Sequence, residues 1–193
     1  MTAGQLLGLG LIVLIVVLVI RSRGAGRQAT YERFERSAMP PELATAKLVL
    51  SEGLIRTRVP AKLASRTDQV YLTPEGMLVP VETKTRKVHR AYDTDRIQLS
   101  VTAVALSYGN RKLPGVRGVA RHGYVRVIRP GDSQPCYLRV DLYTPEQVVK
   151  LENRYQALMA GKVEPRPARN PGLCRGCGQL QKCRAGQELL KSR

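Results

Sequence analysis

Two carboxylates and a lysine lie within a short stretch of the sequence, where they could act together on a phosphate group. Asp68 precedes the tripeptide Pro74-Glu75-Gly76, and Glu82 and Lys84 follow it. Paired carboxylate oxygens are the ligands that hard divalent cations prefer. The competing interpretation is an exposed cross-strand ion-pair cluster, which would contribute little. The elements around these residues decide between the two.

The tripeptide is typical of a β-hairpin loop. We expect one strand between Arg58 and Tyr71 and a second from Gly76 to Lys84, joined by a type I turn with Gly76 in the left-handed conformation. Pro80 lacks a ladder donor, which predicts an irregular or partly unpaired stretch in the second strand.

The loop length fixes which side chains meet. If Thr73 pairs with Met77, paired residue numbers sum to 150, and Asp68 lies across from Glu82 with Cβ atoms about 5 Å apart. Lys84 shares that face because side chains two apart on a strand point the same way. A two-residue loop would shift the register by one and put Asp68 on the other face.

The rest of the soluble part alternates helix and strand signals. Proline at a first turn predicts helices over 42–52 and 145–159, and Asp93 or Thr94 as N-cap predicts a third over 94–108. A glycine follows each helix, and alternation predicts strands over 119–128 and 136–143. No period of about 20 to 50 residues repeats, which excludes a solenoid. The expected order is helix, hairpin, helix, strands and helix.

The first 20 residues contain no charged side chain and are almost wholly apolar. About 20 such residues cross a bilayer as one helix. Arg21, Arg23 and Arg27 follow, so the positive-inside rule predicts a single-pass protein of the cell membrane, with its N-terminus outside and its body in the cytoplasm. The alternatives are a buried core helix and a signal peptide, whose basic n-region and small-residue cleavage site are missing.

The charge is strongly positive and spread along the chain. With 32 Lys+Arg and 15 Asp+Glu, the net charge is +17. Residues 21–36 hold five Arg and two Glu, whereas the chain from Gly161 onward holds eight basic and two acidic residues. Basic residues confined to the membrane-proximal segment would indicate lipid binding, but this spread better suits a nucleic-acid backbone.

Four features follow one another along the chain: Asp68, the tripeptide Glu82-Thr83-Lys84, the helix start from Asp95 to Gln98, and the run GLCRGCGQLQKCR. Together they resemble the PD-(D/E)XK nuclease superfamily, in its RecB-like branch of CRISPR-associated exonucleases. The resemblance covers about residues 40–185 and implies a restriction-endonuclease-like core, a mixed central sheet flanked by helices. We expect four segments: a transmembrane anchor at 1–20, a basic tether at 21–39, the nuclease-like domain at 40–165, and a basic, cysteine-containing tail at 166–193 that packs on the nuclease-like domain.

The resemblance also implies roles for the site residues. Asp68, Glu82 and the Thr83 carbonyl would bind Mg²⁺ or Mn²⁺, Lys84 would position the attacking water, and Gln98, with Asp95, would tie the second helix to the site or to the DNA backbone. The implied function is DNA hydrolysis, expected to be exonucleolytic. The alternative is an inactive nuclease-fold protein that binds nucleic acid at the membrane. The sequence does not identify a protein partner.

The chain departs from the family pattern at three places. The family's first helix carries a His ligand, whereas residues 40–53 contain none, and Glu42 or Glu52 is the available substitute. Thr102 stands where the family places a Tyr four residues after Gln98.

The third departure concerns the cysteines. The family's tail cysteines join an upstream Cys to hold an iron–sulfur cluster, and residues 1–135 contain no Cys. The chain's thiols could therefore hold a cluster, hold zinc with His122 as an alternative fourth ligand, or be free; they are Cys136, Cys174, Cys177 and Cys183.

Overall fold

The structure is a computed structural model that describes residues 35–109, 113–168 and 171–191. The predicted anchor at 1–20 and most of the tether lie outside the described residues. Within the described ranges, no helix is both long and apolar enough to cross a membrane. The chain forms two compact units that divide between Thr144 and Pro145, whereas the boundary predicted from the sequence lies after residue 165.

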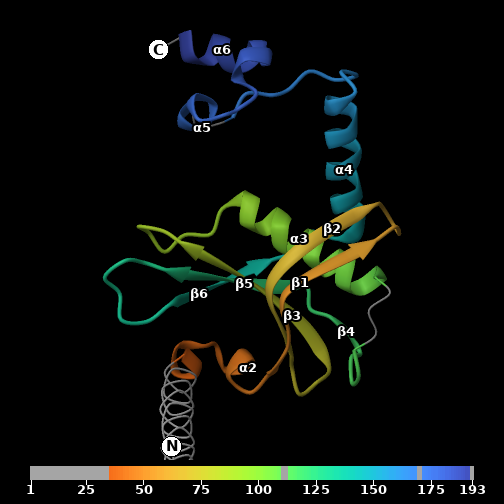
Figure 1. Ribbon diagram of the computed structural model, residues 1–193, viewed down its shortest axis with the longest axis vertical. Helices are drawn as coiled ribbons and strands as arrows, with labels where there is room; N and C mark the ends of the chain where they lie inside the picture. The colour runs from red at the N-terminus through yellow and green to blue at the C-terminus, as the bar shows by residue number, and fades with distance from the viewer. Residues whose placement is uncertain (1–34, 110–112, 169–170, 192–193) are drawn as a thin grey trace, which may run out of the picture. The chain divides into compact units, whose positions relative to one another are not determined.

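The first unit is built on a mixed sheet that has six strands in the described part of the chain, in the order β1-β2-β3-β5-β6, with β4 also paired to β3 (Figure 1). β3 pairs in parallel with β4 and β5, and the other neighbours are antiparallel. The strands are β1 (Lys47–Thr57), β2 (Leu63–Leu72), β3 (Met77–Thr85), β4 (Gly118–Val119), β5 (His122–Ile128) and β6 (Cys136–Asp141). Helix α3 (Asp93–Tyr108) connects β3 to its parallel neighbours, as such pairs require. The predicted mixed α/β class is confirmed.

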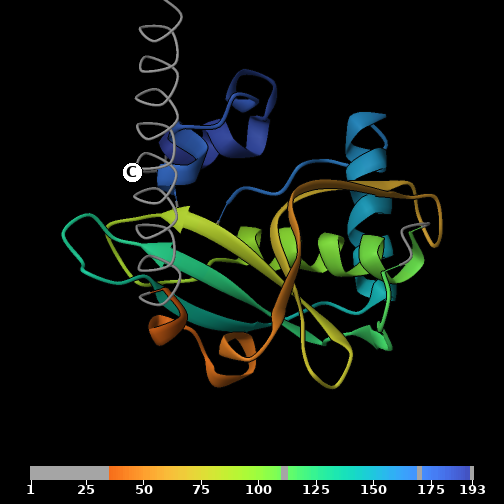
Figure 2. The ribbon, with the colours of Figure 1, turned by 60° about the horizontal axis from the view of Figure 1, so that its bottom comes forward.

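The two faces of the sheet carry different helices (Figure 2). On one face Leu99 of α3 packs with Val125 and Val127. On the other face, Leu43 of the short helix α2 (Pro41–Ala44) packs with Tyr124 and residues of β2 and β3. Successive side chains of β5 alternate between the faces, so anything held beside Tyr124 lies across the sheet from α3.

The predicted hairpin register is confirmed. The β2–β3 pairs include Gln69↔Val81 and Val70↔Pro80, which sum to 150. The Thr73 N–H donates to the Met77 carbonyl at 2.9 Å, and Gly76 has φ 81°. Pro80 is paired on the β2 side, but on its other side the β4 pairs end at Leu78 and the β5 pairs begin at Val81. The interruption predicted at Pro80 therefore exists on one side of the strand.

The helix predicted over 42–52 is wrong. α2 ends at Ala44, and the chain continues as β1, which pairs antiparallel with β2 and has a register shift between Leu48 and Leu50. Leu50 and Ile55 are buried in the strand. Pairing with β2 satisfies the backbone of both strands while burying the same apolar side chains, so it outweighs the helical spacing.

The other predicted elements are largely confirmed, with local differences. α3 begins one residue earlier than expected, and the Asp95 carboxylate accepts the Tyr92 N–H at 2.8 Å, so neither Asp93 nor Thr94 caps the helix. The strand expected over 119–128 is divided into β4 and β5 by Ala120 and Arg121, and β6 ends at Asp141.

The second unit contains helices and no strand among its described residues. α4 (Pro145–Met159) has the predicted bounds. It is followed by α5 (Pro171–Arg175), the short 3₁₀ helix η1 (Leu180–Lys182) and α6 (Arg184–Lys191). Gly186 of α6 is buried beside the Cys174 and Cys183 sulfurs, so α5 and α6 pack closely at this glycine.

Candidate active site

Glu82, Lys84 and Gln98 form a hydrogen-bonded group between β3 and α3. Lys84 Nζ lies 2.6 Å from Glu82 Oε1 and donates to Gln98 Oε1 at 3.1 Å. Glu82 and Lys84 are two residues apart on β3, so both project toward α3, where Gln98 occupies the second turn. The strand and the helix thus converge on one ammonium group.

Glu82 is the buried member of this group, with a side chain only 5% exposed. Burial raises its pKa above the ordinary value, the Lys84 hydrogen bond opposes that rise, and the negative charge of Asp68 adds to it. A cation beside a buried carboxylate favours its charged form. Glu82 is therefore not part of an exposed ion-pair cluster.

Asp68 joins the site through the backbone of β3. The β2–β3 ladder ends at the pair Gln69↔Val81, and beyond it Asp68 Oδ2 accepts the Thr83 N–H at 2.7 Å. The carboxylate thus takes the place of a ladder carbonyl. The N–H and C=O of one strand residue point to the same side, so the Thr83 carbonyl belongs to the Asp68 side of β3.

A second cluster lies beside the first. Asp95, only 1% exposed, accepts two hydrogen bonds from Arg86, at 2.7 and 2.6 Å. Burial alone would raise the pKa of Asp95, but the Arg86 guanidinium and the Tyr92 N–H outweigh burial and hold it below the ordinary value. Asp95 therefore ties the start of α3 to the end of β3 rather than contacting Glu82 or Lys84.

The donor set of the site suits a hard cation of the Mg²⁺ type. Within the described ranges, no three or more His, Cys, Asp or Glu side chains are grouped so that they could hold a metal ion. Mg²⁺ commonly uses only one or two carboxylates, with water and phosphate oxygens completing its shell. Asp68, Glu82 and the Thr83 carbonyl fit that requirement, and their oxygens are brought to one end of the hairpin.

Neither substitute for the family's histidine is shown to join this group. Glu42 lies on the opposite face of the sheet, where Glu42 Oε1 is 2.7 Å from His122 Nε2 and accepts a hydrogen bond from the Tyr124 hydroxyl. Glu52 is on β1 with an exposed side chain and φ 50°.

Thr102 has a structural role in place of the family's tyrosine. It is 1% exposed, its hydroxyl lies 2.6 Å from the Ser65 hydroxyl, and it donates to the Gln98 carbonyl at 3.1 Å. These bonds hold α3 against β2, and they leave no aromatic ring at this position.

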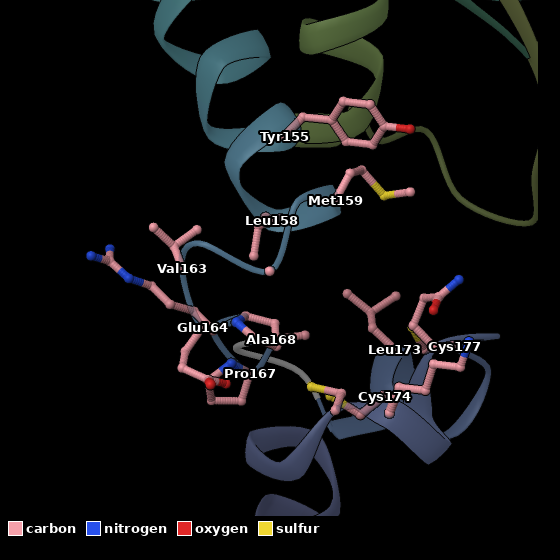
Figure 3. Close-up of a pocket in the computed structure, with 16 residues that line it drawn as sticks. Tyr155, Leu158, Met159, Val163, Glu164, Pro167, Ala168, Leu173, Cys174 and Cys177 are labelled. Carbon is pink, nitrogen blue, oxygen red and sulfur yellow. The ribbon is translucent and has the colours of Figure 1, made fainter.

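Three of the four cysteines line a pocket of about 770 Å³ in the second unit. Figure 3 shows Tyr155 and Met159 of α4 on one side and Leu173, Cys174 and Cys177 on the other. The other pocket-lining thiol, Cys183, accepts a hydrogen bond from the Gly186 N–H at 3.3 Å.

All four thiols are free of disulfides, and Cys136 begins β6 in the first unit. Among the described residues, no three of these thiols lie close enough together to hold a metal ion. The iron–sulfur cluster and the zinc ion stay predictions, and no chemistry is derived from either.

Sequence reasoning missed two contacts. The Arg86–Asp95 pair could have been found from local spacing. Arg86 lies two residues after Lys84, and Asp95 lies three residues, one helical turn, before Gln98, so a contact of Lys84 with Gln98 brings Arg86 and Asp95 close as well. The contact of Glu42 with His122 had none, because it joins residues 80 apart in the sequence.

Comparison with models of known protein families and with curated proteins finds no match. Among solved structures, one described as the crystal structure of SSO0001 aligns with a TM-score of 0.45 and 17% identity. The alignment covers 71% of this chain and 60% of that one, so the chain spans less than two thirds of that structure's length.

Proposed function

We propose that this protein is a metal-dependent DNA nuclease of the PD-(D/E)XK type, similar to its RecB-like branch, held at the cell membrane by residues 1–20. The supporting observation is that β2, β3 and α3 bring four residues to one place: Asp68, Glu82, Lys84 and Gln98. Surface ion pairs rarely include a nearly buried carboxylate, so the burial of Glu82 favours a functional site.

Each residue has a distinct part in this proposal. A Mg²⁺ or Mn²⁺ ion bound by Asp68, Glu82 and the Thr83 carbonyl would polarise the phosphate and acidify a water molecule. Lys84 positions the attacking water and offsets the negative charge that grows on the phosphate. Gln98 holds the Lys84 ammonium in place through its side-chain oxygen.

DNA is the proposed substrate because the excess charge of +17 suits a phosphate backbone. Exonuclease action is proposed from the resemblance alone, and labelled DNA ends provide its test.

A second candidate is an inactive protein of the same fold that binds nucleic acid. The observations that favour it are the buried Thr102 at the family's tyrosine position and the engagement of Glu42 with His122 on the far face of the sheet. A site without a third acidic or histidine ligand could have lost the metal while retaining the basic surface.

One experiment separates the two candidates. Full-length protein in detergent micelles is incubated with single- and double-stranded DNA, labelled at either end, with Mg²⁺ or Mn²⁺. Glu82→Ala and Lys84→Ala are the test variants, and Lys47→Ala, an exposed lysine of β1, is the matched control. Cleavage by the parent and by Lys47→Ala but not by the test variants supports the enzyme. If the parent cleaves no faster than the test variants, the enzyme is excluded, and binding of DNA by that sample supports the second candidate.

Two further expectations have direct tests. The anchor predicts that the protein stays with membranes after a high-salt and carbonate wash and is released by detergent. The cysteine tail predicts iron or zinc in anaerobically prepared protein; finding neither would leave its thiols free.

A further inference from the structure

We propose that an exposed basic surface at the entry to α3, made by Lys87, Arg90 and Tyr92, binds the phosphate backbone of the DNA strand whose scissile bond lies at Asp68 and Glu82. We call it the α3-entry surface. The inference rests on the proposed function, and it assigns a substrate-positioning role to residues outside the family's motifs.

The α3-entry surface is built over Arg86. That side chain donates through both terminal nitrogens to Asp95 and through Nη1 to the Arg90 carbonyl, at 2.8 Å. The Arg86 guanidinium also lies 4.7 Å from the centre of the Tyr92 ring. Arg86 is therefore occupied in shaping the loop, and the backbone at Arg90 is fixed by it.

The loop is held at its other side as well. The Arg86 N–H donates to the Ile128 carbonyl at 3.1 Å, and His89 Nε2 lies 2.7 Å from Asp132 Oδ2. Asp132 also pairs with Arg129 at 2.6 Å. Side chains on a loop anchored in this way lose less conformational entropy when a ligand binds, which favours affinity.

The cations of this surface are available to a ligand. Lys87 and Arg90 are exposed, and neither is within salt-bridge distance of a carboxylate in the described structure. Arg90 lies 5.5 Å from the centre of the Tyr92 ring, which orients its guanidinium without neutralising it. Tyr92 itself is 43% exposed. The nearest acidic neighbour in sequence is the exposed Asp93, so the surface retains a net positive charge.

The α3-entry surface is adjacent to the candidate active site. Arg86 follows Lys84 by two residues, about 7 Å along a strand, and Asp95 lies one helical turn before Gln98. Phosphates of one strand are spaced by about 3.4 Å along the axis of B-form DNA. A strand with one phosphate at Lys84 therefore places a phosphate one or two nucleotides away beside the α3-entry surface. Arginine and an exposed aromatic ring are the groups that bind a backbone and stack on a base.

The test measures binding apart from cleavage. Full-length protein in micelles is titrated into fluorescent single-stranded DNA in EDTA at several NaCl concentrations, and anisotropy gives Kd. We expect Arg90→Gln to weaken binding about 3- to 10-fold at low salt and to reduce the slope of log K against log salt by about one. Arg90→Lys should recover most of the loss. The matched control is Arg121→Gln, an exposed arginine at the opposite end of β5.

The outcomes separate this inference from the proposed function. If Arg90→Gln and Lys87→Gln bind DNA with the Kd and salt slope of Arg121→Gln, the α3-entry surface is rejected even when the parent cleaves DNA. If binding depends on Arg90 while the parent cleaves nothing with Mg²⁺ or Mn²⁺, the surface stands and the nuclease does not. Unchanged thermal unfolding of Arg90→Gln shows that its loss of binding is not a loss of fold.

Discussion

Lys84 Nζ and Glu82 Oε1 lie 2.6 Å apart on the same face of β3. The pair is asymmetric, because the carboxylate side chain is 5% exposed and the lysine side chain 29%. Water reaches the ammonium group far more readily than the carboxylate. Lys84 can therefore interact with a ligand while Glu82 depends on Lys84 to remain charged.

That dependence predicts the behaviour of Lys84→Met. Cleavage should fall by about 100-fold or more, because the variant lacks the charge that offsets the developing negative charge. Glu82 also loses its cationic partner, so its pKa, already raised by burial, should rise further. Unfolding free energy at pH 7 should fall by about 1–3 kcal/mol, the cost of removing the charged hydrogen bond from a buried carboxylate.

The stability of Lys84→Met is checked by urea unfolding followed by circular dichroism. The double variant Glu82→Gln/Lys84→Met should recover most of the stability but none of the cleavage, since no buried charge is then left. A double variant as unstable as Lys84→Met would contradict this account of the pair.

Two substitutions of Asp68 separate the effect of its charge from the effect of its hydrogen bond. Its Oδ2 accepts the Thr83 N–H at 2.7 Å, and an asparagine can accept the same bond. Asp68→Asn should therefore keep the parent's stability within about 0.5 kcal/mol and lose cleavage, whereas Asp68→Ala should also lose about 1–2 kcal/mol by leaving that N–H unpaired. Urea titrations and end-labelled DNA assays on the two variants measure both effects. Equal stability of the two would show that the bond to Thr83 contributes nothing.

The hairpin part of the site could be predicted because its determinants are local. The tripeptide Pro74-Glu75-Gly76 sets the loop length, and the loop length sets the register. The ladder ends at Gln69↔Val81, and Asp68 then accepts the Thr83 N–H instead of pairing directly with Glu82. Gln98 could be placed because the helix signals around it are strong and α3 follows β3 directly. Each step used residues close together in the sequence, where turn and cap chemistry decides.

The errors arose where tertiary packing outweighs local pattern. Residues 42–52 have apolar side chains at helical spacing, yet most of the segment forms β1, because the neighbouring edge of β2 needs a partner. The contact of Glu42 with His122 arises because α2 packs on the sheet. No local sequence pattern predicts this packing. Long-range pairing of this kind is set by the whole core rather than by any window of the sequence.

The Arg86–Asp95 pair predicts a defined dependence of stability on pH. The pKa of Asp95 is lowered in the folded protein, so its contribution is present above the unfolded pKa of about 4 and is lost as pH falls through the lower folded value. Asp95→Asn should cost about 3 kcal/mol at pH 7, because it leaves the Arg86 guanidinium, 18% exposed, without its anion.

The measurement compares unfolding free energies of the parent and Asp95→Asn between pH 7 and pH 3. The difference should be constant down to about pH 5 and should shrink below about pH 4. Asp93→Asn, which changes an exposed carboxylate of the same turn, is the matched control and should change stability by less than about 0.5 kcal/mol. A difference that stays constant to pH 3 would show that the ion pair does not lower the pKa of Asp95.

Glu42 tests whether α2 contributes to the chemistry. Its carboxylate accepts the Tyr124 hydroxyl and contacts His122 on the face of the sheet opposite α3, and burial together with Glu42 raises the pKa of Tyr124. Glu42→Ala should therefore lower unfolding free energy by about 1–2 kcal/mol through the unpaired tyrosine, while the rate of DNA cleavage per folded molecule stays within about twofold of the parent. An Ala at a metal ligand should abolish cleavage, as we expect for Glu82→Ala. A comparable loss in Glu42→Ala would therefore mean that α2 supplies a metal ligand, which contradicts the arrangement described. Retained cleavage would show that Glu42 supplies no metal ligand.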